Sequence, residues 1–223
     1  MSRTPRVDAE GNVQSCFSSP TALAGIASWV AVLFIVCILC SAGLVKPTGT
    51  SFCESGLNAV MTCPCSNTPA PGGGCGNYGP GAIGQGAVLT ALGNASVTDG
   101  MDTLQFQVTG ENDTALTVLL QASSTTSGVA YGAGVSCLGG PTLKLYHGHA
   151  GGPEPQGQLT RPLVGLQSSV HTRSAALGDL IAAGQTRYYM AGYRDPKAAW
   201  GTNCNDPSKT FNSSQGVAVV WTP

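Results

Sequence analysis

Cysteine is the residue type with the most evident chemistry in this chain. A thiol can form a disulfide, bind zinc or act as a nucleophile. Of the nine cysteines, six follow a long apolar stretch, and they are Cys53, Cys63, Cys65, Cys75, Cys137 and Cys204. An even number on one side of such a stretch is what disulfides in an oxidising compartment require. Free thiols in a cytosolic domain are the alternative.

The first four of these cysteines are closely spaced, in the pattern C-x9-C-x-C-x9-C. Four thiolates could bind zinc, but zinc sites favour C-x2–4-C pairs, and C-x-C places its sulfurs awkwardly around one tetrahedral ion. We therefore predict disulfides. A bond between Cys63 and Cys65 would be strained, so each is expected to pair with Cys53 or Cys75.

Two histidines, His147 and His149, flank Gly148. On a strand both rings would lie on one face, where a third ligand could complete a zinc or copper site. The nearest carboxylate is Glu154, beyond a Gly-Gly-Pro turn, and His171 is remote. The pair is a weak metal candidate, and we predict neither a metal nor a cofactor.

Other catalytic patterns are missing from the sequence. Residues 79–84 formally fit G-x-G-x-x-G, but they include Pro80 and precede a predicted strand rather than the helix that a phosphate cradle needs. No G-x-S-x-G nucleophile elbow occurs, and paired carboxylates are too few to suggest an acid and a base. We predict a protein that is not an enzyme, without catalytic residues. Its net charge of −1 also argues against nucleic-acid binding.

Aromatic residues gather near the C-terminal end, at Tyr188, Tyr189, Tyr193 and Trp200. They are interpreted either as core and edge residues of a β-domain or as an aromatic binding patch, for which Tyr188, Tyr193 and Trp200 are the candidates.

The apolar stretch that precedes these residues spans positions 21–45 and contains no charged side chain. As a helix it would be about 37 Å long, enough to cross a hydrocarbon core of about 30 Å. We predict an uncleaved transmembrane helix, and the alternative is a signal peptide cleaved near the small residues at 41–43. Arg3 and Arg6 favour a cytoplasmic tail at 1–20 and an exported C-terminal domain.

Beyond the stretch, residues 46–85 are predicted to be a linker and cysteine-rich loop, and residues 86–223 a β-domain. Only 9% of residues are charged, and Leu104, Phe106 and Val108 alternate with polar residues. Candidate strands are 87–97, 103–109, 115–122, 128–135, 142–147, 163–170, 187–193 and 216–221, with a possible short helix at 174–183. This pattern predicts an all-β, disulfide-stapled β-sandwich, jelly-roll or immunoglobulin-like.

Several segments together form a recognisable signature: TCPCSN (62–67), PGGGCGN (71–77), SCLGG (136–140), TRYYMAGYRDP (186–196), FNSSQG (211–216) and VVWTP (219–223). Over residues 52–223 the chain resembles a cysteine-stapled C-terminal β-domain of large exported proteins of planctomycete-type bacteria, whose pattern is CPCGN…PGxGC, RYYQxWYRDP and FNxxNGxxVxW. The resemblance implies export, no known catalytic activity and a bridge between Cys137 and Cys204. This chain departs from the family because its domain follows a membrane anchor directly.

These observations predict a bacterial single-pass membrane protein with a cytoplasmic N-terminus and a periplasmic or extracellular domain. We expect a non-catalytic interaction module, an accessory or scaffolding subunit of a membrane or cell-envelope complex, respiratory or photosynthetic complexes being examples. Its partners would be the membrane and other membrane-protein subunits. The alternatives are a carbohydrate- or surface-polymer-binding β-sandwich and, less favoured, a metal carrier or enzyme using His147 and His149.

Overall fold

The computed structural model describes residues 6–7, 13–14, 47–69, 71–77, 85–151, 155, 157–195 and 210–223. The chain divides into two compact units, residues 1–44 and 45–223. In the first unit, β1 (Arg6–Val7) pairs antiparallel with β2 (Val13–Gln14). The predicted transmembrane helix at 21–45 lies outside the described residues. Within the described ranges, none of the helices has the length and apolar composition that a membrane crossing requires.

The second unit is built from antiparallel β-sheets, which confirms the mostly β fold. The largest sheet has five strands in the order β3 (Thr50–Phe52), β12 (Phe211–Val220), β11 (Thr186–Arg194), β6 (Leu116–Ala122) and β9 (Leu143–His149). A three-stranded sheet has the order β10 (Leu159–Arg161), β5 (Gln105–Thr109) and β4 (Val88–Leu92). The strands β7 (Ser124–Tyr131) and β8 (Gly134–Gly139) form a separate hairpin.

The main hydrophobic core lies between the three-stranded and five-stranded sheets. On β5, Phe106 and Val108 are 1% and 2% exposed, as their alternation with polar residues predicts. The ring of Phe106 packs against Tyr189 of β11 with a centroid separation of 4.4 Å. Trp221 is fully buried and donates its indole N–H to the Tyr189 hydroxyl at 3.2 Å.

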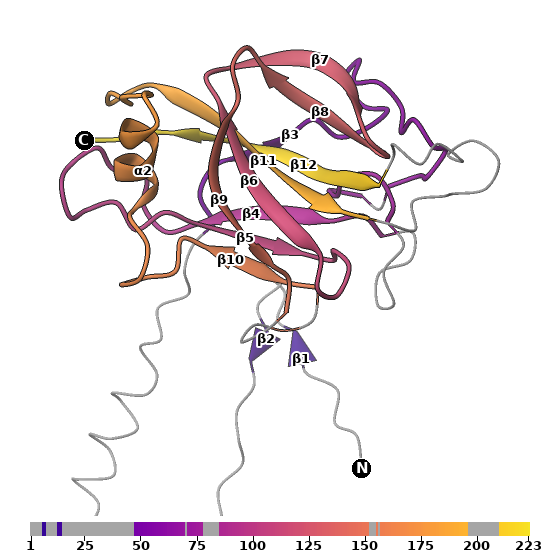
Figure 1. Ribbon diagram of the computed structural model, residues 1–223, viewed down its shortest axis with the longest axis horizontal. Helices are drawn as coiled ribbons and strands as arrows, with labels where there is room; N and C mark the ends of the chain where they lie inside the picture. The colour runs from indigo at the N-terminus through magenta and orange to yellow at the C-terminus, as the bar shows by residue number, and fades with distance from the viewer. Residues whose placement is uncertain are drawn as a thin grey trace, which may run out of the picture. The chain divides into compact units, whose positions relative to one another are not determined.

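The β7–β8 hairpin packs against the other face of the five-stranded sheet (Figure 1). Strand β12 is therefore covered on both faces, and six consecutive residues of it are buried. Its buried polar side chains are bonded to neighbouring backbone. Gln215 accepts from the Leu89 N–H at 3.0 Å and donates to the Leu89 carbonyl at 2.7 Å, which ties β12 to β4.

A single short helix, α2 (Val170–Ala176), covers one end of the β-domain among the described residues. Ser169 caps it by accepting the Thr172 N–H at 3.3 Å, a common N-terminal signal. The helix begins and ends earlier than the predicted range of 174–183. The predicted strand at 163–170 is wrong, because this segment is a turn that leads into the helix.

Candidate binding cleft

One of two disulfides joins the cysteine-rich segment to the β-domain, and the other closes a loop within the segment. Cys53 is bonded to Cys137 and Cys63 to Cys75, and each pair has a Cα–Cα distance of 5.7 Å. Cys65 is disulfide-bonded as well. The predicted disulfide chemistry is thus confirmed, and it indicates an oxidising, extracytoplasmic environment for this domain.

The detailed pairing differs from the prediction. The bridge from Cys137 to Cys204 is wrong, because Cys137 bonds Cys53; Cys204 lies outside the described residues. Strand β3, which ends next to Cys53, pairs with β12, and β8 lies across β12, where the Ser213 hydroxyl donates to the Val135 carbonyl at 2.9 Å. This crossing brings the two cysteines together. Cys63 bonds Cys75, which is one of the two partners expected for it. The same expectation for Cys65 is wrong, because Cys53 and Cys75 are both bonded to other cysteines.

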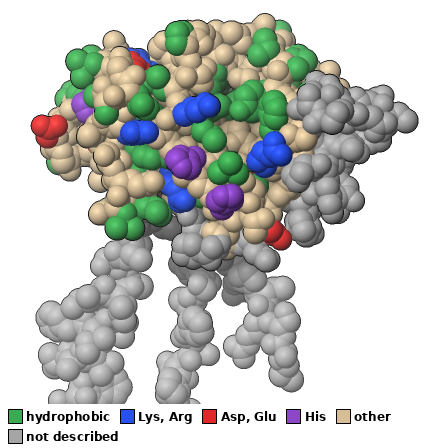
Figure 2. All heavy atoms as spheres, in the orientation of Figure 1, with side chains coloured by type: hydrophobic (Ala, Val, Ile, Leu, Met, Phe, Trp, Pro, Cys, Tyr) green, Lys and Arg blue, Asp and Glu red, His purple; other side chains and the backbone are tan. Residues whose placement is uncertain are grey.

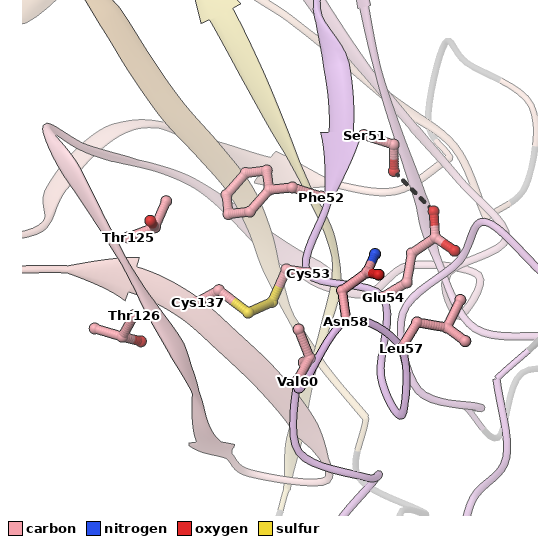
Figure 3. A pocket seen from close by; sticks show the side chains of 10 residues that line it. All are labelled: Ser51, Phe52, Cys53, Glu54, Leu57, Asn58, Val60, Thr125, Thr126 and Cys137. Carbon is pink, nitrogen blue, oxygen red and sulfur yellow. Dashed lines mark hydrogen bonds between the residues drawn. A yellow bond between two sulfur atoms is a disulfide. The ribbon is translucent and has the colours of Figure 1, made fainter.

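A cleft of about 250 Å³ opens beside the Cys53–Cys137 disulfide (Figure 3). The disulfide and the ring of Phe52 lie toward its middle, and the exposed hydroxyl side chains of Thr125 and Thr126 on β7 line one side. The loop that follows β3 lines the other. The complete lining is Ser51, Phe52, Cys53, Glu54, Leu57, Asn58, Val60, Thr125, Thr126 and Cys137.

The loop that forms this second side has an unusual backbone. Cys53, Asn58 and Ala59 have φ angles of 65°, 49° and 63°, a region that side-chain-bearing residues rarely adopt. The loop is closed on itself, since the Ser55 hydroxyl and the Gly56 N–H donate to the Met61 carbonyl at 3.0 and 3.2 Å. Backbone of this kind persists only where the surroundings impose it. The disulfide and these bonds therefore hold the cleft in one shape.

The chemistry of the cleft suits binding by hydrogen bonds and apolar contact. Ser51, Thr125 and Thr126 offer hydroxyl groups, Asn58 an amide and Glu54 a carboxylate, which accepts the Ser51 hydroxyl at 3.4 Å. Leu57 lines the cleft, and 53% of its surface is exposed. The sulfur atoms are bonded to each other, so neither acts as a thiolate.

The edge strand β3 also contributes to this site. It pairs with β12 on one side only, and Thr50 and Ser51 are exposed. An open strand edge offers backbone N–H and C=O groups to an added strand from another chain. The cleft adjoins this edge through Ser51 and Phe52.

The predicted metal candidates lie elsewhere. His147 and His149 are both exposed on β9, and Nδ1 of His149 lies 3.2 Å from the Thr114 carbonyl oxygen. As expected for a strand, the two rings share one face. In the described part of the chain, no group of three or more His, Cys, Asp or Glu side chains could hold a metal ion.

The predicted aromatic patch does not form one surface. Tyr188 is half-buried and packs edge-on against Phe52, with ring centroids 5.4 Å apart. Tyr193 is 1% exposed, and its hydroxyl accepts Nδ2 of Asn77 at 3.1 Å. Burial raises the pKa of this tyrosine well above its ordinary value. The two side chains point to opposite faces of β11, so Tyr193 is not available to a ligand. Trp200 lies outside the described residues.

Most of the residues that line the cleft were not predicted from sequence. The dense cysteines marked the loop as an ordered segment, but no pattern indicated that Leu57 or Asn58 would meet Thr125 and Thr126 of a distant hairpin. Comparison with protein-family models, with curated proteins and with solved structures finds no match. Any functional assignment therefore depends on the residues themselves.

Proposed function

We propose that this chain is a non-catalytic interaction module, presented outside the bacterial cytoplasm by a single N-terminal membrane helix. It would serve as an accessory or scaffolding subunit of a membrane or cell-envelope complex. The observation that carries the proposal is the cleft beside the Cys53–Cys137 disulfide, at the open edge of β3. The resemblance to exported bacterial β-domains and the expected jelly-roll or immunoglobulin-like sandwich are consistent with this role.

The cleft supports binding for two reasons. Its side chains offer hydrogen-bonding groups around an apolar surface, which is the usual composition of a specific ligand site. The Cys53–Cys137 disulfide holds the loop of the cleft, so less free energy is spent on ordering this loop when a partner binds. A partner segment could add to β3 through its backbone and place one side chain beside Phe52 and Leu57.

Co-purification tests this proposal. The full-length chain, extracted in a mild detergent, should retain a stoichiometric protein partner. Leu57→Arg should release that partner, because it places a charge at the cleft. Val129→Arg is the matched control, since Val129 is 55% exposed on β7 and does not line the cleft. A partner retained equally by both variants, or a monodisperse wild-type monomer, would contradict the proposal.

A carbohydrate ligand is the second candidate, and the ring of Phe52 beside hydroxyl, amide and carboxylate groups favours it. Sugars are commonly held by such a combination of apolar contact and hydrogen bonds. In that case the wild-type protein would bind neutral glycans without a protein partner, and Leu57→Arg would weaken that binding while Val129→Arg would not.

A further inference from the structure

Cationic side chains gather around strand β9, away from the cleft. The described residues of the second unit include five lysines and arginines, and these are Lys144, Arg161, Arg173, Arg187 and Arg194. Arg187 is bound to Asp179 in a salt bridge of 2.6 Å. Figure 2 shows Lys, Arg and His side chains close together on one face, with hydrophobic side chains between them.

The register of the five-stranded sheet explains part of this arrangement. His147 and His149 of β9 lie opposite Val118 and Leu116 of β6. Residues that are opposite each other on neighbouring strands share a face of the sheet. The two imidazole rings therefore flank an apolar strip on β6, which consists of Leu116, 39% exposed, and Val118, partly buried against the cluster under the β7–β8 hairpin.

A β-bulge brings Lys144 to the same face. The register shifts between Leu119 and Leu120, so that Tyr146 lies opposite Leu119 but Lys144 lies opposite Leu120. Without this shift, Lys144 and His147, three residues apart, would point to opposite faces. Lys144 and His149 are thus the ends of one row of polar side chains about 17 Å long, in which Lys144 carries a positive charge.

Arg194 borders the apolar strip from the other side. Tyr193 of β11 pairs with Thr117 of β6, so the following residue, Arg194, comes level with Leu116. Two strand spacings separate β11 from β9, which places Arg194 about 10 Å from the His149 row. The strip on β6 therefore has one positive side chain on either side, Lys144 on β9 and Arg194 on β11.

The two remaining arginines occupy the free edge of β9. Arg173 donates its Nε–H to the Leu145 carbonyl at 2.9 Å, and Arg161 donates to the His147 carbonyl at 3.5 Å. Because these carbonyls are engaged, the edge is a poor acceptor for a strand from another protein. Among the described residues, Lys144, Arg173 and Arg194 have no carboxylate within ion-pairing distance.

We propose that this face, the β9 face, binds an acidic polysaccharide. The sugar rings would lie on the apolar strip of β6, and their carboxylate or sulfate groups would meet the cations on either side. The whole chain has a net charge of −1, yet positive side chains outnumber negative ones among the residues named for this face. A linear polyanion would complement this local positive charge. The exposed apolar side chain of this face, Leu116, belongs to a strand and not to an amphipathic helix of the kind that lies in a membrane surface. The proposal is independent of the cleft.

Binding of the full-length chain in detergent to dextran sulfate, polygalacturonate and unmodified dextran tests this inference. We expect the two acidic polymers to bind, with an affinity that falls as salt is added, and dextran not to bind. Lys144→Gln combined with Arg194→Gln should weaken binding to the acidic polymers by about tenfold. Val129→Glu combined with Leu180→Glu changes the net charge equally, at exposed positions that are not among the residues named for this face, and should leave binding within about twofold.

Three results would overturn the inference. These are absence of binding to both acidic polymers at low ionic strength, equal loss of affinity in the two double variants, and binding to phosphatidylglycerol vesicles without binding to either acidic polymer. A failure of this inference is distinguishable from a failure of the proposed interaction module, because Leu57→Arg changes only the cleft.

Discussion

The cleft and the β9 face are two exposed regions of the same domain that owe their shape to different forces. The cleft is assembled from a loop and a hairpin far apart in sequence, and a covalent bond between Cys53 and Cys137 joins them. The β9 face is assembled by strand register alone, with one bulge that adjusts it. We infer that the cleft depends on oxidation, whereas the β9 face persists as long as the sheet is folded.

Removal of the cleft disulfide should produce the largest effect. The Cys53–Cys137 bond closes a sequence separation of 84 residues, so Cys53→Ser with Cys137→Ser should lower the free energy of unfolding by about 4.5 kcal/mol. Removing Cys63–Cys75, with a separation of 12, should cost less, about 3 kcal/mol. Urea unfolding of each double variant measures both values. Equal losses, or a larger loss for the shorter loop, would contradict the ranking.

The same disulfide variant should separate the two regions functionally. Under conditions where it remains folded, it should lose the partner that binds the cleft and keep its affinity for dextran sulfate. Pull-down of the partner and titration with the polymer on one preparation provide the measurement. Parallel loss of both would show that the regions are coupled.

Truncation of the aromatic ring in the cleft should have an intermediate effect. Phe52 packs against Tyr188 and covers Gly216, where an added Cβ would meet its ring. Phe52→Ala should therefore destabilise the domain by about 2 kcal/mol, less than a fully buried phenylalanine. Leu57→Ala, at a position with 53% exposure, should change stability by less than about 0.5 kcal/mol. Thermal unfolding distinguishes the two.

Acid should weaken the salt bridge between Arg187 and Asp179, which lies at the α2 end and belongs to neither region. Two hydrogen bonds from Arg187, at 2.6 and 2.7 Å, lower the pKa of Asp179 below its usual value. The stabilisation from this bridge is complete above about pH 4 and is lost as pH falls through the lowered folded-state pKa. Urea midpoints measured from pH 7 to pH 2 should fall in this range. Asp179→Asn should be less stable at pH 7 and should lack this part of the decline.

The contrast between the regions also shows what sequence can predict. The alternation of Phe106 and Val108 with polar residues indicated a strand directly, because every second residue of a strand faces the core. Oxidised cysteines followed from their parity. The turn between β7 and β8 was missed, since the predicted strand at 128–135 runs through Tyr131–Gly134, where the hairpin reverses. Gly132 is the first of the two residues between the paired Tyr131 and Gly134 and has a φ of 61°, so Gly132-Ala133 matches the glycine-first loop of a type II′ hairpin, a signal that the prediction overlooked.

Long-range placement was harder to predict from the residues. The sequence FNSSQGVAVV has polar residues that would normally mark a wet face, yet Asn212 to Gln215 are all buried. Their partners, such as the Leu89 backbone for Gln215, come from strands distant in sequence. For the same reason, the role of Tyr193 was misjudged. Which face of a strand is covered by another layer depends on topology, and one sequence does not specify that.

Site-specific photo-crosslinking offers the most direct test that the cleft is the binding site. A photoreactive amino acid would replace Leu57 at the cleft in one sample and Val129 on β7 in another, at matched exposures of 53% and 55%. In the full-length protein, the account predicts one specific crosslinked partner from position 57 and none from position 129. A specific adduct from position 129 alone, or no adduct from either position, would contradict it.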